Sequence, residues 1–169
     1  MIVVDTNVVS KLMRLEPAEV VVGWVQRHDP RELSVSAVTV AENLYGTERL
    51  VDGQRKKKLR ALAQELFTQF VDDVLPFDSA AAMRYAQIID QRDRQGAPIG
   101  GVDAQIAAMC WVDDPTLATR NEHDFVDVEV RIMNPWSGHE TLQTRWICTS
   151  HAHRRSADAV GIVVTWMCV

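Results

Sequence analysis

The sequence predicts an α/β fold with a mostly parallel central sheet of about five strands. Two observations lead to this prediction. Short apolar runs typical of buried strands alternate along the chain with longer segments whose apolar residues recur at helical spacing. The chain also has 169 residues, of which 47% are hydrophobic and 24% are charged. That content excludes disorder of the whole chain, and the length suits one globular core.

The first strand is predicted over residues 2–4, where Ile-Val-Val ends at Asp5. An unbroken apolar run of this kind is typical of a parallel strand covered on both faces. Further strands are predicted over residues 33–36, 74–77, 117–119 and 130–133. Helices are predicted over residues 8–13, 17–25, 39–51, 54–72, 80–94 and 103–112. Thr6 and Asn7 are suitable N-caps for the first helix.

The domain is predicted to end at Trp136, because the composition changes after Asn-Pro-Trp. Residues 137–169 hold two of the three cysteines and three of the five histidines. We therefore predict a domain over residues 1–136 and a C-terminal extension over residues 137–169. One strand is predicted over residues 160–169, and the rest of the extension is predicted to be loop or disordered. A fusion, a frameshift product and a genuine extension all remain open.

The sequence shows none of the patterns that indicate a membrane span, a signal segment, a disulfide framework or a structural zinc site. No apolar run approaches the ~20 residues of a membrane-spanning helix, and no basic segment precedes the first apolar run. Three cysteines give no disulfide framework, and His151, His153 and Cys148 lack the paired spacing of a structural zinc site. We expect a cytoplasmic protein.

Four acidic residues follow separate strands or begin helices, and they are Asp5, Glu42, Asp103 and Asp124. Since ligands bind at the carboxyl ends of strands in open α/β sheets, these side chains are expected at one edge. Crowded carboxylates need a cation, and oxygen ligands favour Mg²⁺ or Mn²⁺. Such a site suits phosphoryl transfer, and it is compatible with the net charge of −5.

Each acid also has a purely structural interpretation. Asp5 and Asp103 are both suitable helix caps, Glu42 suits a solvent-facing helix position, and Asp124 suits a turn. An aspartyl phosphotransferase with Asp5 as nucleophile is disfavoured, because such enzymes usually place a second acid where this chain has Asn7. The prediction of a site therefore depends on the four acids as a set.

Four motifs in order carry a resemblance to a known family. They are Val-Val-Asp5-Thr-Asn, Glu42 after Ser-Val-Ser-Ala-Val-Thr-Val-Ala, Asp103-Ala-Gln-Ile-Ala-Ala, and Leu-Ala-Thr-Arg-Asn121-Glu-His-Asp124-Phe. From Met1 to Trp136 the chain resembles PIN-domain ribonucleases. Within that family it is most similar to the VapC toxins of type II toxin–antitoxin pairs, in the FitB-like branch. The resemblance implies a PIN-like three-layer α/β/α fold and a Mg²⁺-dependent endoribonuclease, with Mn²⁺ as the other candidate metal.

The resemblance also implies a role for each matching residue. Asp5 and Asp103 are the expected metal ligands, and Glu42 and Asp124 complete the catalytic acids. Thr6 and Asn121 are expected to orient carboxylates, and Arg120 to contact a substrate phosphate. The run Arg55, Lys56, Lys57, Lys58 and Arg60 is a second candidate for RNA phosphates, although a solvated helix face is the preferred interpretation.

The expected partners are a VapB/FitA-like antitoxin, the RNA substrate, a second toxin copy, and DNA through the antitoxin alone. Trp24, the segment around Leu44 and Tyr45, and residues 59–70 are the candidate apolar docking surfaces. The alternative function is a weakly active or inactive PIN protein that works mainly in an antitoxin-containing repressor complex on DNA.

Overall fold

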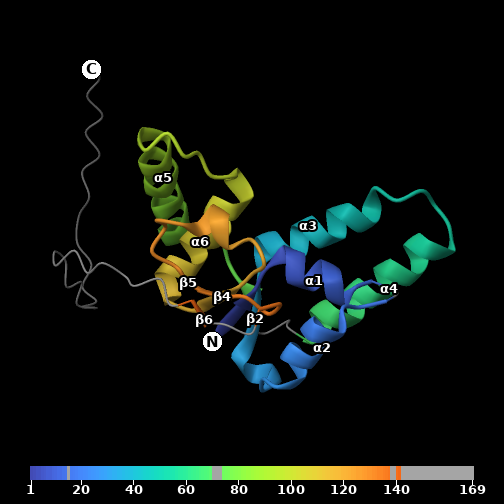
Figure 1. The fold of residues 1–169 in the computed structure, drawn as a ribbon. Coiled ribbons are helices and arrows are strands. Elements are labelled where there is room, and N and C mark those ends of the chain that lie inside the picture. The colour runs from blue at the N-terminus through green and yellow to red at the C-terminus, as the bar shows by residue number, and fades with distance from the viewer. Residues whose placement is uncertain (15, 70–73, 138–139, 142–169) are drawn as a thin grey trace, which may run out of the picture.

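The centre of the molecule is a six-stranded sheet with the order β3-β2-β1-β4-β5-β6 (Figure 1). The computed structural model describes residues 1–14, 16–69, 74–137 and 140–141. The strands are β1 (Ile2–Val4), β2 (Leu33–Ser36), β3 (Val74–Leu75), β4 (Thr116–Ala118), β5 (Arg131–Met133) and β6 (Glu140–Thr141). The first five pair in parallel, and β6 pairs antiparallel to β5 at one edge.

The central strand β1 fixes the position of the site. Val3 pairs with Ser34 of β2 and with Leu117 of β4. Val3, Val35 and Leu117 are completely buried, as expected for strands that helices cover on both faces. Because β1, β2 and β4 are parallel neighbours, the residues that follow them lie at the same edge of the sheet.

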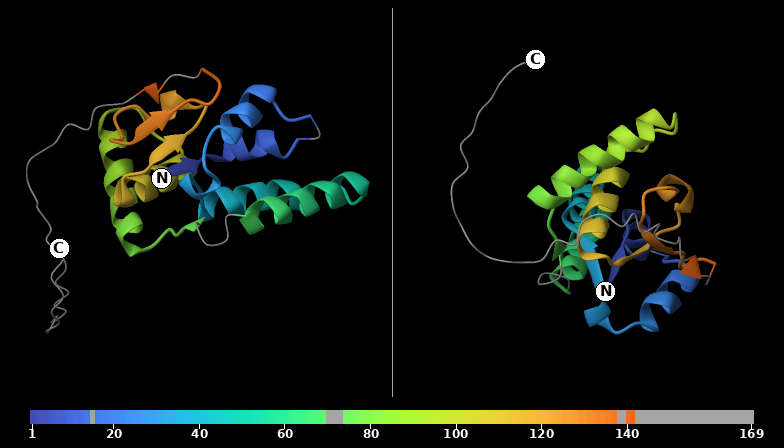
Figure 2. Two further views of the ribbon diagram at one scale, coloured as in Figure 1. Left: turned by 90° about the horizontal axis from the view of Figure 1, so that it is seen from below. Right: turned by 90° about the vertical axis from the view of Figure 1, so that its left-hand side faces the viewer.

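Helices cover both faces of the sheet, as the two views of Figure 2 show. They are α1 (Thr6–Leu12), α2 (Glu19–Gln26), α3 (Ala37–Glu48), α4 (Gln54–Gln69), α5 (Ser79–Arg94) and α6 (Gly101–Asp113), with 3-10 turns η1 (Pro30–Glu32) and η2 (Glu122–Phe125). One core cluster joins α5 and α6 to the sheet through Ile88 and Ile106. The other joins α1, α2 and α4 through Val9, Trp24 and Ala63. The predicted three-layer α/β/α class is confirmed.

Some local predictions were wrong. The N-cap of α1 is Asp5, whose side chain accepts a hydrogen bond from the Thr6 N–H, so neither Thr6 nor Asn7 is the cap. The helix α6 begins at Gly101, which places Asp103 in its first turn. Asp103 is therefore not a cap, because Gly100 occupies that position.

Two features at the chain's later elements were not predicted. Asp114 takes a left-handed conformation with φ 51°, which lets the short connection from α6 enter β4 without a glycine. The edge strand β6 lies beyond the predicted boundary at residue 136.

The predicted strand over residues 160–169 and the end of the predicted helix over residues 54–72 lie outside the described residues. Within the described residues, no helix is long and apolar enough to span a membrane.

Candidate active site

Asp5 lies at the carboxyl end of β1 and is 3% exposed. Its Oδ1 accepts a hydrogen bond of 2.6 Å from the Thr6 N–H. Its Oδ2 accepts one of 2.6 Å from the Thr119 hydroxyl and one of 2.5 Å from the Asn7 amide. Burial raises the pKa of Asp5 above its ordinary value, although the bonds from Thr119 and Thr6 lower it. Three donors thus hold a buried carboxylate in one orientation.

Asn7 and Thr119 were not among the predicted site residues. The Asn7 amide also donates to the Thr119 hydroxyl at 2.9 Å, and its Oδ1 accepts from the Arg120 N–H at 3.2 Å. Asn7 therefore ties the start of α1 to the end of β4, across the carboxylate of Asp5. Both residues lie within the Asp-Thr-Asn and Leu-Ala-Thr motifs, but only the adjacency of β1 and β4 reveals their roles.

Glu42 belongs to α3, which directly follows β2. Ser36 is the N-cap of α3, and its hydroxyl accepts a 2.9 Å hydrogen bond from the Thr39 N–H. The half-buried Glu42 side chain accepts a 2.7 Å hydrogen bond at Oε2 from the Thr6 hydroxyl. Thr6 thus donates its backbone N–H to one acid and its hydroxyl to another. This is the orienting contact expected of Thr6.

Asp103 projects from the first turn of α6 and is half-buried. The pKa of Asp103 is raised to about 6, mainly by burial and then by the charges of Asp5, Asp124 and Glu42, in that order of importance. A Cβ at Gly100 would lie 2.8 Å from Asp103 Oδ2. The missing side chain of Gly100 therefore leaves the space that the Asp103 carboxylate occupies.

Asp124 lies in η2, after β4, and is also half-buried. The amide of Asn121 donates a hydrogen bond to its Oδ2, which is the contact expected of Asn121. The exposed Arg120 lies beside these residues, with its guanidinium carbon 5.8 Å from the centre of the Trp136 ring. Arg120 is therefore at the rim of the site and accessible to solvent.

The structure brings the predicted acids together: Thr6 donates to both Asp5 and Glu42, and Asn121, which follows β4, donates to Asp124. Asp5 and Asp103 each have a pKa raised by the charges of Glu42 and Asp124. No three acidic, histidine or cysteine side chains among the described residues already enclose an ion position. A hard divalent cation that keeps several waters needs only one or two carboxylates. Asp5 and Asp103 are the carboxylates that could hold such a cation, whose charge would offset the repulsion among the acids.

Comparison with known proteins agrees with this arrangement. The PIN domain family matches residues 2–130. The chain belongs to the PIN-domain family. Ribonucleases of this family depend on divalent metal ions, in keeping with the carboxylate donors described above.

The similar PIN-domain proteins cover most of the chain. The chain is 37% identical to Toxin FitB of Neisseria gonorrhoeae, over 80% of this chain and 99% of that protein. It is 36% identical to VapC ribonuclease Y4jK of Sinorhizobium fredii, over 80% of this chain and 98% of that protein. The solved structure of FitAB bound to an IR36 DNA fragment matches with a TM-score of 0.76 and 34% identity, over 85% of this chain and 100% of that one.

Proposed function

We propose that this PIN-domain protein is an endoribonuclease that acts as the toxin of a type II toxin–antitoxin pair. The observation that carries the proposal is the convergence of Asp5, Glu42, Asp103 and Asp124 at one edge of the sheet. The similarity to a protein named VapC ribonuclease supports RNA as the substrate, and the similarity to FitB supports the toxin role.

Asp5 and Asp103 would hold the metal ion, and Mg²⁺ is the ion proposed because it prefers oxygen ligands and retains waters; Mn²⁺ is the second candidate. When bound, such an ion polarises a phosphate oxygen and lowers the pKa of water. Asn7 and Thr119 keep Asp5 in its orientation.

Glu42 and Asp124 would complete the acidic pocket and accept protons or hydrogen bonds from water near the phosphate. Thr6 and Asn121 hold these two carboxylates in place. Hydrolysis adds one water across the phosphodiester. Its oxygen bonds to phosphorus, the bond from phosphorus to the 3′ oxygen breaks, and a proton reaches the departing oxygen. The products carry a 5′-phosphate and a 3′-hydroxyl. Arg120 at the rim would contact the substrate phosphate.

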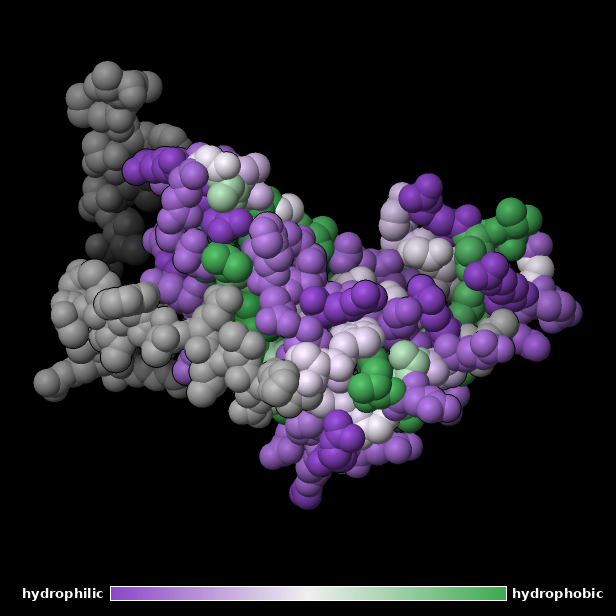
Figure 3. All heavy atoms as spheres, viewed as in Figure 1, coloured by the Kyte–Doolittle hydropathy of each residue, from purple (hydrophilic) through white to green (hydrophobic). Residues whose placement is uncertain are grey.

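We propose an antitoxin of VapB/FitA type as the partner, with DNA bound through the antitoxin, because FitAB forms a complex on DNA. The exposed apolar side chains of Leu44, Tyr45 and Val51 supply docking surface. Figure 3 shows hydrophobic atoms at the end where α3 leads into α4, together with other hydrophobic areas on a mostly hydrophilic face. Trp24 is 4% exposed and belongs to the core instead.

We retain residues 1–136 as the proposed PIN domain and residues 137–169 as its extension, with β6 adding one strand to the sheet from the start of that extension. We also propose a homodimer, and the cytoplasm as the compartment.

The test is cleavage of a fluorescent single-stranded RNA by the purified chain, with Mg²⁺ or with a chelator. We expect metal-dependent fragments that end in 5′-phosphate and 3′-hydroxyl groups, and no fragments from Asp5→Asn. Fragments with 2′,3′-cyclic phosphate ends, or cleavage that persists in Asp5→Asn, would contradict the mechanism. A folded chain that never cleaves RNA but joins an antitoxin on DNA would favour the repressor-partner function.

A further inference from the structure

A groove of about 730 Å³ opens beside the acidic site, between α1, α3 and α4. We call it the α1–α3–α4 groove. It is lined by Ser10, Met13, Arg14, Glu16, Glu42 and Asn43 on one part, and by Gly46, Thr47, Leu50, Arg55 and Leu59 on the other. Its volume lies within the range of specific ligand sites, which is about 300–1,000 Å³. Because Glu42 belongs both to the groove and to the acid cluster, the groove begins at the proposed reaction centre.

The wall between α1 and α3 is polar. Both helices begin at the carboxyl edge of the sheet, where Thr6 donates to Glu42. One turn further along, the Ser10 hydroxyl donates to Asn43 Oδ1 at 2.9 Å. Thr47 continues this row by donating to the Asn43 carbonyl at 3.0 Å. These hydrogen bonds hold α1 and α3 together along the groove, with Asn43 and Thr47 buried and Ser10 exposed.

Two arginines face the same groove from different elements. Arg14 follows α1 and Arg55 belongs to the first turn of α4, and both are exposed. Within the part of the chain that the structure describes, neither side chain forms an ion pair.

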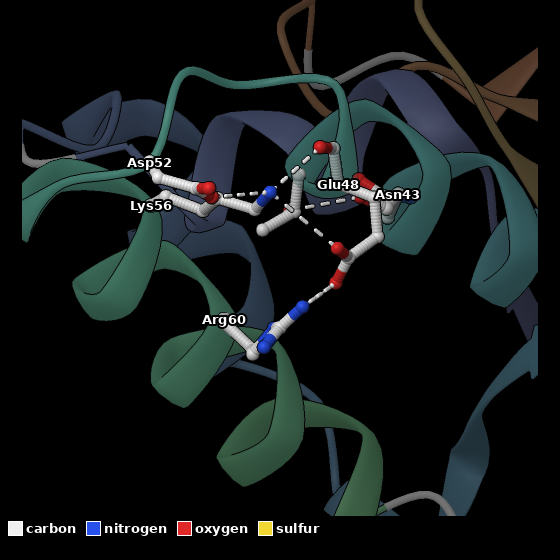
Figure 4. Close-up of polar contacts among 6 residues, drawn as sticks. Asn43, Glu48, Asp52, Lys56 and Arg60 are labelled. Carbon is white, nitrogen blue, oxygen red and sulfur yellow. Dashed lines mark hydrogen bonds and ion pairs between the residues drawn. The ribbon is translucent and has the colours of Figure 1, made fainter.

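Two other cations of the basic run, Lys56 and Arg60, are already paired with acids. Lys56 contacts Asp52 at 3.0 Å and Glu48 at 3.6 Å, and Arg60 forms an ion pair with Glu48 (Figure 4). Arg60 holds the pKa of Glu48 below its ordinary value. This cluster ties the beginning of α4 to the end of α3. It is Arg55, rather than Lys56 or Arg60, that lines the groove.

We propose that the α1–α3–α4 groove holds the RNA strand next to the scissile phosphate, with Arg14 and Arg55 binding its phosphates. The inference rests on the proposed ribonuclease function and identifies where the substrate extends from the acids. Guanidinium groups bind phosphate oxygens bidentately, and the exposed Ser10 hydroxyl adds a polar group to the groove wall. Besides Glu42, the groove lining contains one acid, Glu16, whose negative charge opposes phosphate binding.

Binding of a fluorescent single-stranded RNA to the Asp103→Asn protein, over a series of salt concentrations, tests the proposal. Each phosphate contact contributes about 0.7 to the slope of log K against log salt for single strands, or about fivefold in affinity at 0.1 M salt. We expect Arg14→Gln and Arg55→Gln each to lower the slope by about 0.7 and the affinity for RNA by about fivefold at 0.1 M salt. Arg27→Gln, an exposed arginine outside the groove, is the matched control and keeps the slope. Glu16→Gln binds more tightly.

A steric variant tests the groove without changing charge. A Cβ at Gly46 would meet nothing within 4 Å, so Gly46→Ala fits. Gly46→Leu projects into the groove and is expected to raise the KM for RNA cleavage relative to Gly46→Ala, with kcat little changed. Circular dichroism confirms that both variants fold.

The possible results distinguish a failure of the groove proposal from a failure of the proposed ribonuclease function. Wild-type cleavage together with unchanged salt slopes in both arginine variants overturns the groove and leaves the ribonuclease function intact. Absence of wild-type cleavage, with arginine-dependent RNA binding, overturns the function and supports the groove. Arginine variants that bind RNA normally but lose a protein partner would overturn the proposal, because the groove then belongs to that partner.

Discussion

The stability of the folded chain is expected to increase when Asp103 is replaced by Asn. Asp103 is a half-buried carboxyl beside three other acids, and its pKa rises from 3.8 to about 6. Such a rise corresponds to roughly 3 kcal/mol between the folded and unfolded states without screening. Because the side chain is half-exposed, solvent reduces this to about 1–2 kcal/mol. Asp103→Asn should be more stable than the wild type by that amount at pH 7.5.

The sign of the pH dependence follows from the direction of the shift. Between pH 3.8 and about 6 the unfolded chain ionises Asp103 while the folded chain keeps it protonated, so stability falls as pH rises. Below pH 4 the variant and the wild type should converge. Added Mg²⁺ should stabilise the wild type at pH 7.5 and have little effect on Asp103→Asn.

Urea denaturation at pH 4 to 8 measures these differences, with Asp93→Asn as the control because Asp93 is an exposed residue of α5. A wild-type free energy of unfolding that stays flat from pH 4.5 to 7.5 would refute the electrostatic reasoning. So would an Asp103→Asn protein that is less stable than the wild type at pH 7.5.

Three further changes test separate parts of the account. Thr119→Val removes a donor from the buried Asp5 carboxylate and should lower the free energy of unfolding by about 1–3 kcal/mol in urea denaturation, whereas Thr119→Ser should lose less. Gly100→Ala places a Cβ 2.8 Å from Asp103 Oδ2; calorimetric titration should show weaker Mg²⁺ binding with unchanged circular dichroism, and unchanged affinity would contradict the packing argument. Deletion of residues 142–169 should leave the RNA cleavage rate unchanged, and a loss of folding would instead show that the extension completes the domain.

Asp5 and Asp103 were predictable because Asp5 directly follows a strand and Asp103 lies in the first turn of a helix, whereas Glu42 lies in the middle of α3 and Asp124 lies six residues after β4. For Asp5 and Asp103 the local sequence suffices to place the carboxylate at the edge of a parallel sheet. The structural interpretation of Asp5 as a helix cap also holds, since its Oδ1 accepts the Thr6 N–H. One carboxylate therefore caps α1 and faces the acid cluster, so the two interpretations do not exclude each other.

The supporting contacts could not be predicted from local sequence. Asn7 and Thr119 are 112 residues apart, and they meet only because β1 pairs with β4 instead of with β3. Sequence order does not specify that pairing. The role of Gly100 likewise depends on the direction of the Asp103 side chain. The groove between α1, α3 and α4 depends on how α4 returns along α3, which helical periodicity does not determine.

Metal-dependent RNA cleavage at the acidic site is tested most directly by mapping new 5′ ends in total bacterial RNA treated with the purified, partner-free chain. We expect discrete 5′-phosphate ends that appear with Mg²⁺, disappear with chelator, and are absent with Asp5→Asn. The same set of ends from Asp5→Asn, or ends that form in chelator, would contradict the assignment of the acidic edge of the sheet as a metal-dependent ribonuclease site.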